Sequence, residues 1–206
     1  PFYSGVTIVE GSVYNSEQAA PNIHALVNGG KVCAMGDSKT LIVSAKGDGS
    51  LVFYTGMNTN ENWAKEPGID FSNKARVLDW FRTEFSGLAN VYSEVFENAD
   101  PSFAVRPQYC MPFEQTWPSL ANLTMLGDAA HLMPPYAGEG VNMAMLDAVE
   151  LCSCLIDPNS PDLKSAIEAY EHEMRNRASE VAQETMRNTA AMHSENAIEF
   201  FVSAIS

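Results

Sequence analysis

One short stretch of the chain collects most of the residues that could do chemistry. Residues 126–148 read LGDAAHLMPPYAGEGVNMAMLDA and combine an acid, a histidine, two adjacent prolines and two glycines. Asp128 follows the apolar run 121–127, which predicts a buried strand, and strand carboxyl ends are where α/β sheets place groups that contact ligands. Pro134 and Pro135 fix φ twice and stiffen the loop that follows.

The second half of the stretch predicts a helix start that faces a ligand. Gly138 and Gly140 have no Cβ, so a flat molecule can lie against the main chain there. The amides of Gly140, Val141 and Asn142 would be the unpaired donors of a helix N-terminus. A strand, turn and helix without a ligand would explain a lone Gly-x-Gly, but the features occur here together and in order. The stretch therefore predicts a binding site.

This stretch resembles the second flavin-binding motif of the FAD-dependent aromatic hydroxylases, the class A flavoprotein monooxygenases that include para-hydroxybenzoate hydroxylase. Within that group the pattern is most similar to the tetracycline-inactivating monooxygenases. Weaker similarity covers nearly the whole chain, including MPFEQTW at 111–117 and a long C-terminal helix. The resemblance implies an α/β fold of the para-hydroxybenzoate hydroxylase type, an α+β substrate sheet plus part of a Rossmann-like FAD-binding domain.

The resemblance also implies roles for individual residues. Asp128 would bond a ribityl hydroxyl of FAD, and Pro134 and Pro135 would line the reactive edge of the flavin. The remaining flavin contacts would come from the main chain of Gly138, Gly140, Val141 and Asn142, the last three at the pyrimidine end of the ring. The residues expected to line the substrate are Tyr136, Met111 and Phe113.

The implied activity is monooxygenation. In such enzymes NADPH or NADH reduces FAD, O₂ adds to the flavin, and the hydroperoxide hydroxylates an aromatic or polyketide-like molecule; the cofactor carries the chemistry. No catalytic side chain and no metal site is predicted. His131 lacks the second imidazole of a typical metal site, so a packed or hydrogen-bonded loop residue is favoured. A non-catalytic ligand-binding fragment and a related flavin reductase or epoxidase are the alternatives.

Two features depart from the implied family. The sequence has no Gly-x-Gly-x-x-Gly fingerprint after an N-terminal strand, the loop that holds the FAD pyrophosphate. We therefore expect the C-terminal half of a larger flavoenzyme, with the missing N-terminal FAD-binding segment as its partner and no tight FAD binding or activity alone. At the positions that match the polar tetracycline-gripping residues stand Glu10, Lys31 and Val52, and Glu139 replaces the usual Gln or Lys. Glu10, Lys31 and Val52 predict poor turnover of tetracycline, and the carboxylate of Glu139 would disfavour the anionic reduced flavin.

Periodicity predicts the elements that must position the motif. Short β-branched and aromatic runs predict an antiparallel sheet, with Gly residues in a hairpin loop at 46–50. Apolar stripes predict a broken helix or helix pair over 73–97 with Ser72 as N-cap, and extended chain over 99–113. The predicted strands are 6–10, 31–35, 40–45 and 51–56. The later helices are 140–156 and one that Ser160 caps, which continues past 185 and has Leu163 in its buried stripe. The predicted domains are 1–120 for the substrate sheet, 121–157 for the FAD-binding part and 158–206 for the terminal helix.

The composition of the chain limits the kinds of partner that it can bind. The net charge of −14 over 206 residues disfavours nucleic acid and anionic membrane surfaces, both of which need a basic face. No apolar run reaches the roughly 18–20 residues of a membrane span. Four cysteines without metal-type spacing predict buried free thiols and a cytoplasmic location. An unpaired strand at 121–127 would also let the chain self-associate through an exposed edge.

Overall fold

The computed structural model describes residues 1–65 and 68–205, which divide into two compact units. The sheet unit comprises residues 5–107 and 190–206, and the flavin-motif unit comprises residues 1–4 and 108–189. The secondary structure is mixed α/β, as predicted. The division of the chain into three parts by function stays a prediction.

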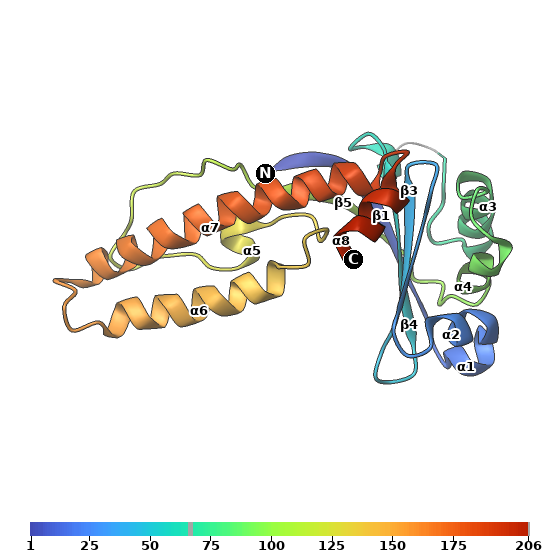
Figure 1. The fold of residues 1–206 in the computed structure, drawn as a ribbon, viewed down its shortest axis with the longest axis horizontal. Coiled ribbons are helices and arrows are strands. Elements are labelled where there is room, and N and C mark those ends of the chain that lie inside the picture. The colour runs from blue at the N-terminus through green and yellow to red at the C-terminus, as the bar shows by residue number, and fades with distance from the viewer. Residues whose placement is uncertain (66–67, 206) are drawn as a thin grey trace. The chain divides into compact units, whose positions relative to one another are not determined.

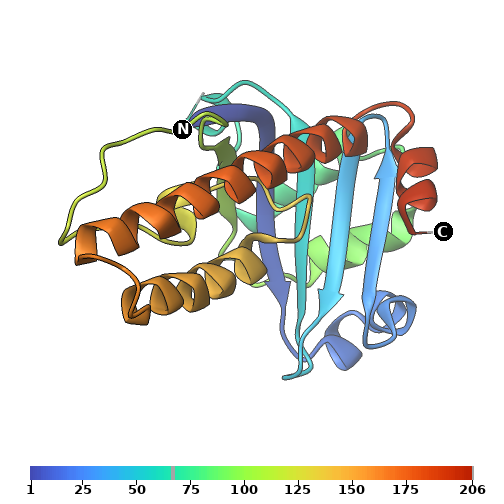
Figure 2. The same cartoon turned by 60° about the vertical axis from the view of Figure 1, so that its left-hand side comes forward.

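The sheet unit is built on an antiparallel sheet, as the sequence predicts. The sheet has five strands in the order β2-β3-β4-β1-β5, and β1 pairs with β4 although they are far apart in sequence (Figures 1 and 2). Its strands are β1 Phe2–Val13, β2 Lys31–Gly36, β3 Lys39–Ala45, β4 Leu51–Asn58 and β5 Ala104–Cys110. The predicted hairpin loop at 46–50 is confirmed, and Gly49 in it has a φ of +82°, which glycine adopts without strain.

An aromatic core explains why this sheet has one buried face. Phe53 on β4 is fully buried and packs on Phe96 at 4.6 Å between ring centroids, while Phe81 stacks on Phe96 at 4.0 Å between centroids. Phe81 belongs to helix α3 Lys74–Glu84 and Phe96 to helix α4 Ser93–Glu97. The two helices cover one face of the sheet (Figure 1). Buried rings of this size dominate the energetics of a small core.

The predicted helical region at 73–97 is indeed broken. A short 3-10 turn, η2 Asn90–Tyr92, follows α3 and leads into α4. Ser72 was expected as the N-cap, and that prediction is wrong. Asn73 caps α3 because its side-chain oxygen accepts from the amides of Ala75 and Arg76 at 3.1 and 3.3 Å. The remaining elements of the sheet unit are α1 Ser16–Ala19, α2 Pro21–Val27, η1 Trp63–Lys65 and α8 Ala197–Ile205.

The flavin-motif unit is a small helical layer. Its helices are α5 Asp128–His131, α6 Gly140–Ile156 and α7 Leu163–Met192, of which α7 runs past residue 185 as predicted. Helices α6 and α7 lie side by side, with α5 beside them (Figures 1 and 2). Tyr170 and Met174 of α7 are buried against Met143 of α6. This core is small for the length of chain that it supports.

The start of α7 differs from the prediction. Ser160 was expected to cap the helix, but the Asp162 carboxylate accepts from the Ser165 amide at 2.8 Å and takes that role. Leu163, expected in the buried stripe, is 53% exposed because it opens the first turn. The free cysteines were also expected to be buried, yet only Cys110 is fully so and Cys152 is exposed on α6.

The predicted buried strand at 121–127 is absent. Leu123 is 61% exposed and Leu126 is 41% exposed, and the segment makes only an isolated bridge between Leu120 and Leu123. A strand needs a neighbour to satisfy its amides and carbonyls, and no other strand among the described residues offers one here. Side chains of α7 hold the segment instead: the Tyr170 hydroxyl donates to the Met125 carbonyl at 3.0 Å.

A buried carboxylate on α7 completes this support. Glu171 is 1% exposed and accepts from the hydroxyls of Ser119 at 2.5 Å and Thr124 at 2.8 Å. Burial alone would raise the pKa of Glu171, but the hydrogen bonds from Ser119, Trp117 and Thr124 outweigh it and the pKa is lowered. The glutamate therefore fixes, as an anion, the chain that leads into Asp128.

Candidate functional site

A hollow of about 800 Å³ lies in the flavin-motif unit where the predicted motif folds back on itself. Its volume is in the range of pockets that bind cofactors and drug-sized ligands. Its walls come from the loop after α5 and from the first turns of α6. The lining residues are Asp128, Met133, Pro134, Pro135, Ala137, Gly138, Glu139, Gly140, Val141, Ala144, Met145 and Ala148. Most of the residues predicted to contact a flavin thus surround one space.

Asp128 stands at the mouth of this hollow with an exposed side chain. Its place depends on Gly127, which has φ +59° and ψ −145°, a backbone conformation that only glycine tolerates well. A Cβ on Gly127 would also come within 3.2 Å of the Ala144 Cβ on α6. The residue before Asp128 must therefore be glycine, for its conformation and for its close packing on α6.

The other wall of the hollow combines a loop stiffened by two prolines with glycine main chain that has open space beside it. Pro134 and Pro135 line the hollow, and Gly138 turns the chain into α6 with a φ of +74°. A Cβ on Gly138 or Gly140 would meet no atom within 4 Å, so both glycines leave open space toward the hollow. The first amides of α6 have no carbonyl one turn before them and are free to meet an acceptor.

The structure does not bring every predicted residue to this hollow. Asn142 is exposed, and its side chain donates to the Glu139 carboxylate at 3.2 Å, which orients Glu139 beside the helix start. Among the described residues that line the hollow, Met111, Phe113 and Tyr136 do not appear. Met111 nevertheless joins its segment to the loop, because its amide donates to the Leu132 carbonyl at 2.8 Å.

A charged network that the sequence interpretation missed lies behind Asp128. Asp147 of α6 is fully buried; its carboxylate accepts from the Gly127 amide at 2.8 Å, from His131 Nε2 at 2.6 Å and from Arg177 at 2.8 Å. Arg177 also reaches Glu150. Burial would raise the pKa of Asp147, but the bonds from Gly127, His131 and Arg177 outweigh it and the pKa is lowered. An acid inside the apolar run of α6 was the sequence signal.

His131 is a packed and hydrogen-bonded residue, as predicted. It is 2% exposed, and its bond to Asp147 places a proton on Nε2. Its Nδ1 atom is buried without a hydrogen-bond partner. Across residues 1–65 and 68–205, no group of three His, Cys, Asp or Glu side chains is arranged to hold a metal ion.

These residues fit an isoalloxazine ring with its ribityl chain. The fit rests on three observations: an exposed carboxylate that could bond hydroxyl groups, glycine main chain with open space beside it, and a helix start, at Gly140 and Val141, in the lining of the hollow. The helix start is favourable for negative charge by roughly 0.3–1 kcal/mol at an exposed end. The glycine loop that would hold a pyrophosphate is not among the described residues of this unit.

The face of the sheet opposite Phe53 carries a polar group of its own. Tyr54 pairs in register with Glu10, whose carboxylate bonds Arg106 at 2.6 Å. Partial burial and then the Glu10 charge raise the pKa of Tyr54. Lys31 and Val52 lie on the same face, since both align with Ser44 of β3. The three positions that differ from the tetracycline-acting enzymes therefore do share one face.

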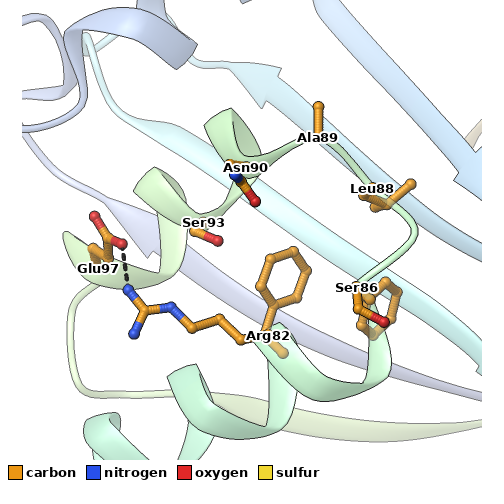
Figure 3. Close-up of a pocket in the computed structure, with 9 residues that line it drawn as sticks. Arg82, Ser86, Leu88, Ala89, Asn90, Ser93 and Glu97 are labelled. Atoms are coloured by element: carbon orange, nitrogen blue, oxygen red, sulfur yellow. Dashed lines mark hydrogen bonds and ion pairs between the residues drawn. The ribbon is translucent and has the colours of Figure 1, made fainter.

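A separate hollow of about 370 Å³ lies between α3 and α4 in the sheet unit (Figure 3). Arg82 and Glu97 at its rim pair with each other at 2.7 Å, and their side chains are 52% and 43% exposed. Ser86, Asn90 and Ser93 add polar groups around a floor of phenylalanine rings (Figure 3). Because Arg82 and Glu97 neutralise each other and are exposed to solvent, this pocket is a weaker candidate for a ligand site than the hollow at Asp128.

Comparison with known proteins also favours the hollow at Asp128 as the functional site. The family described as FAD binding domain matches residues 119–185, which contain the whole hollow. The monooxygenase asqM of Emericella nidulans is 24% identical over 254 aligned residues, covering 100% of this chain and 57% of asqM. The chain therefore spans little more than half the length of this curated relative.

Solved structures show the same fold. HpxO of Klebsiella pneumoniae, solved with FAD and uric acid, superposes with a TM-score of 0.74 at 18% identity, covering 98% of this chain and 49% of HpxO. The tetracycline destructase Tet(51) gives a TM-score of 0.60 at 12% identity, covering 99% of this chain and 52% of that protein. The predicted resemblance and fold class are confirmed.

Proposed function

We propose that this chain, which carries the fold and the second flavin-binding motif of the FAD-dependent aromatic hydroxylases, supplies the substrate sheet and one wall of the flavin site of an NADPH- or NADH-dependent monooxygenase. The observation that carries this proposal is the hollow that joins Asp128, the double proline and the start of α6. Bound FAD would supply the reductive activation of oxygen.

The residues of this chain have three tasks in that proposal. Asp128 bonds the hydroxyl chain of the cofactor, and Pro134 and Pro135 shield its reactive edge from water. The amides of Gly140, Val141 and Asn142 orient the pyrimidine end. None of these groups needs to exchange a proton with the substrate, so their effects should appear in cofactor binding and positioning.

The substrate class follows from relatives and from the sheet. HpxO was solved with uric acid, a flat heteroaromatic molecule. Here the face bearing Tyr54, Glu10 and Arg106 combines an aromatic surface with paired charges. These features support a flat, partly apolar aromatic or polyketide-like substrate with polar substituents.

The proposed partner is a segment that carries the pyrophosphate-binding glycine loop. Helix α6 supports this, because several of its apolar side chains face solvent: Val149 is 63% and Ile156 is 73% exposed. Leu123 and Leu126 add to that surface. Exposed apolar area of this kind marks a binding face or an association risk. The strand edge expected at 121–127 does not form, so this apolar surface takes its place as the proposed contact. Alone, we expect the chain to self-associate through it and to bind FAD weakly.

Two features of the chain bear on its location. Among the described residues, no helix is both long and apolar enough to cross a bilayer. All four cysteines are free thiols, and the cytoplasmic location predicted from them stays a proposal.

The test uses the complete protein, meaning this chain joined to the proposed FAD segment. We expect a yellow protein with a flavin absorption band that oxidises NADPH and inserts an atom of ¹⁸O₂ into an aromatic substrate. NADPH oxidation without oxygen insertion would identify a reductase. Absence of flavin from the purified protein, and of FAD binding on titration, would contradict the proposal and favour a non-catalytic ligand-binding fragment.

A further inference from the structure

One buried hydroxyl on α7 closes both ends of the double-proline loop. Thr185 is 0% exposed, its Oγ1 donates to the Pro134 carbonyl at 2.7 Å, and the same oxygen accepts from the Ala137 amide at 3.0 Å. A hydroxyl has one donor and two acceptor lone pairs, so a single side chain can make both bonds. The segment Pro134–Ala137 is thereby tied to α7.

Other contacts join the loop as well. Pro134 and Pro135 have no N–H groups to donate. The Gly138 amide donates to the Pro135 carbonyl at 3.2 Å, within the turn. One helical turn after Thr185, the Asn188 side chain donates to the Tyr136 carbonyl at 3.2 Å. Two side chains of α7, outside the motif itself, therefore hold the loop.

We propose that Thr185 is a positioning residue that holds the double-proline loop at the distance from the flavin that hydroxylation requires. The inference rests on the proposed function. Pro134, Pro135 and Ala137 line the hollow, whereas Thr185 is not among its lining residues, so it acts through the loop. A displacement of this wall should therefore weaken FAD binding and also misplace the reacting groups, which lowers the yield of hydroxylation.

The substitution Thr185→Val tests this, because valine keeps the shape of threonine and removes both hydrogen bonds. Thr185→Ser restores the hydroxyl and should rescue. Thr55→Val is the matched control, since this buried threonine on the core side of the sheet also donates one hydrogen bond and accepts one, both with the main chain of Val9, and its loss leaves the loop bonds intact. All three variants are made in the complete protein.

Three measurements separate positioning from general destabilisation. In the flavin-free protein, hydrogen exchange at the Ala137 amide should become at least tenfold faster in Thr185→Val and not in Thr55→Val. On titration, Thr185→Val should raise the Kd for FAD about tenfold, because the two lost hydrogen bonds let the loop leave the conformation that lines the hollow. The share of oxidised NADPH that yields hydrogen peroxide instead of hydroxylated product should rise severalfold.

The outcomes are distinguishable. Wild-type FAD affinity and coupling in Thr185→Val would overturn the inference alone, as would a Thr185→Ser variant as impaired as the valine. Equal uncoupling by Thr55→Val would show that only stability matters and would overturn the inference. Failure of the unaltered complete protein to bind FAD would overturn the proposed function, and this inference with it.

Discussion

The imidazole of His131 donates from Nε2 to Oδ2 of Asp147 across 2.6 Å, and both side chains are buried. The same carboxylate oxygen accepts from the Gly127 amide at 2.8 Å. One buried anion thus fixes the backbone on both sides of Asp128. A change in the charged network around Asp147 should therefore move Asp128, which lines the hollow.

Replacement of this anion should loosen the site. Asp147→Asn keeps the size of the side chain but removes the charge that binds Arg177 and His131. We expect a loss of about 1.5–3 kcal/mol in unfolding free energy, the range for hydrogen bonds to charged groups. Denaturant unfolding measures it. Glu150→Gln, which removes a bond to the same Arg177 and leaves Gly127 held, should cost less than half as much.

The buried acids also predict acid sensitivity. The folded-state pKa values of Asp147 and Glu171 are both lowered, chiefly because their hydrogen bonds outweigh burial. Each therefore contributes stability that is fully present above its unfolded pKa, about 4, and is lost as pH falls through the folded value. Thermal melting between pH 6 and pH 2 should show stability falling below about pH 4. A Glu171→Gln variant should show a shallower fall; an unchanged slope would exclude Glu171 from this effect.

Asp128 should matter for the cofactor and little for the fold, since its side chain is exposed. Asp128→Ala in the complete protein should weaken FAD binding by about 1.5–3 kcal/mol, the worth of a hydrogen bond to a charged group. Equilibrium dialysis with FAD measures this. Glu168→Ala, an exposed acid on α7, serves as the control for lost charge. Full flavin content in Asp128→Ala would remove Asp128 from the site.

Much of the scaffold was predictable because its signals are local. Side chains of β4 alternate between the two faces of the sheet, with Phe53 and Thr55 toward the core and Tyr54 away from it. The sequence of this strand predicts that alternation. The helix at 140–156 ends where predicted because Asp157-Pro158 cannot continue it. The cap at Asn73 instead of Ser72 shows the limit of such local prediction. Both residue types are good N-caps, and only the folded backbone decides which side-chain oxygen reaches the helix amides.

The rest depended on contacts between distant segments. The run at 121–127 looks like a buried strand, yet a strand forms only where a neighbour meets it, and Leu123 is exposed here. Asp147 had a visible signal, a charge inside an apolar helix. Thr185 had none, because a threonine in a mixed helix gains its role only when the loop at Pro134 folds onto it.

Tetracycline should be a poor substrate of the complete protein. The positions that match its polar contacts carry Glu10, already paired with Arg106 at 2.6 Å, together with Lys31 and the apolar Val52. Polar groups of a buried ligand left without partners cost more than a lost methylene does. Tetracycline absorbance should stay stable with enzyme, NADPH and oxygen, while rapid bleaching would contradict this prediction.

Glu139 should tune the reduction of the bound flavin. Its carboxylate lies in the lining of the hollow at the start of α6, held by the Asn142 side chain at 3.2 Å. Because flavin gains negative charge on reduction, a neighbouring carboxylate opposes the step that the helix start favours. Glu139→Gln removes that charge with little change of shape, so the two-electron potential should rise by about 10–30 mV, where 30 mV corresponds to roughly 1.4 kcal/mol. Dye-equilibration titration of the complete protein measures the potential, with Glu168→Gln as the remote control. An unchanged or lower potential in Glu139→Gln would mean that the carboxylate is turned to solvent and does not act on the flavin.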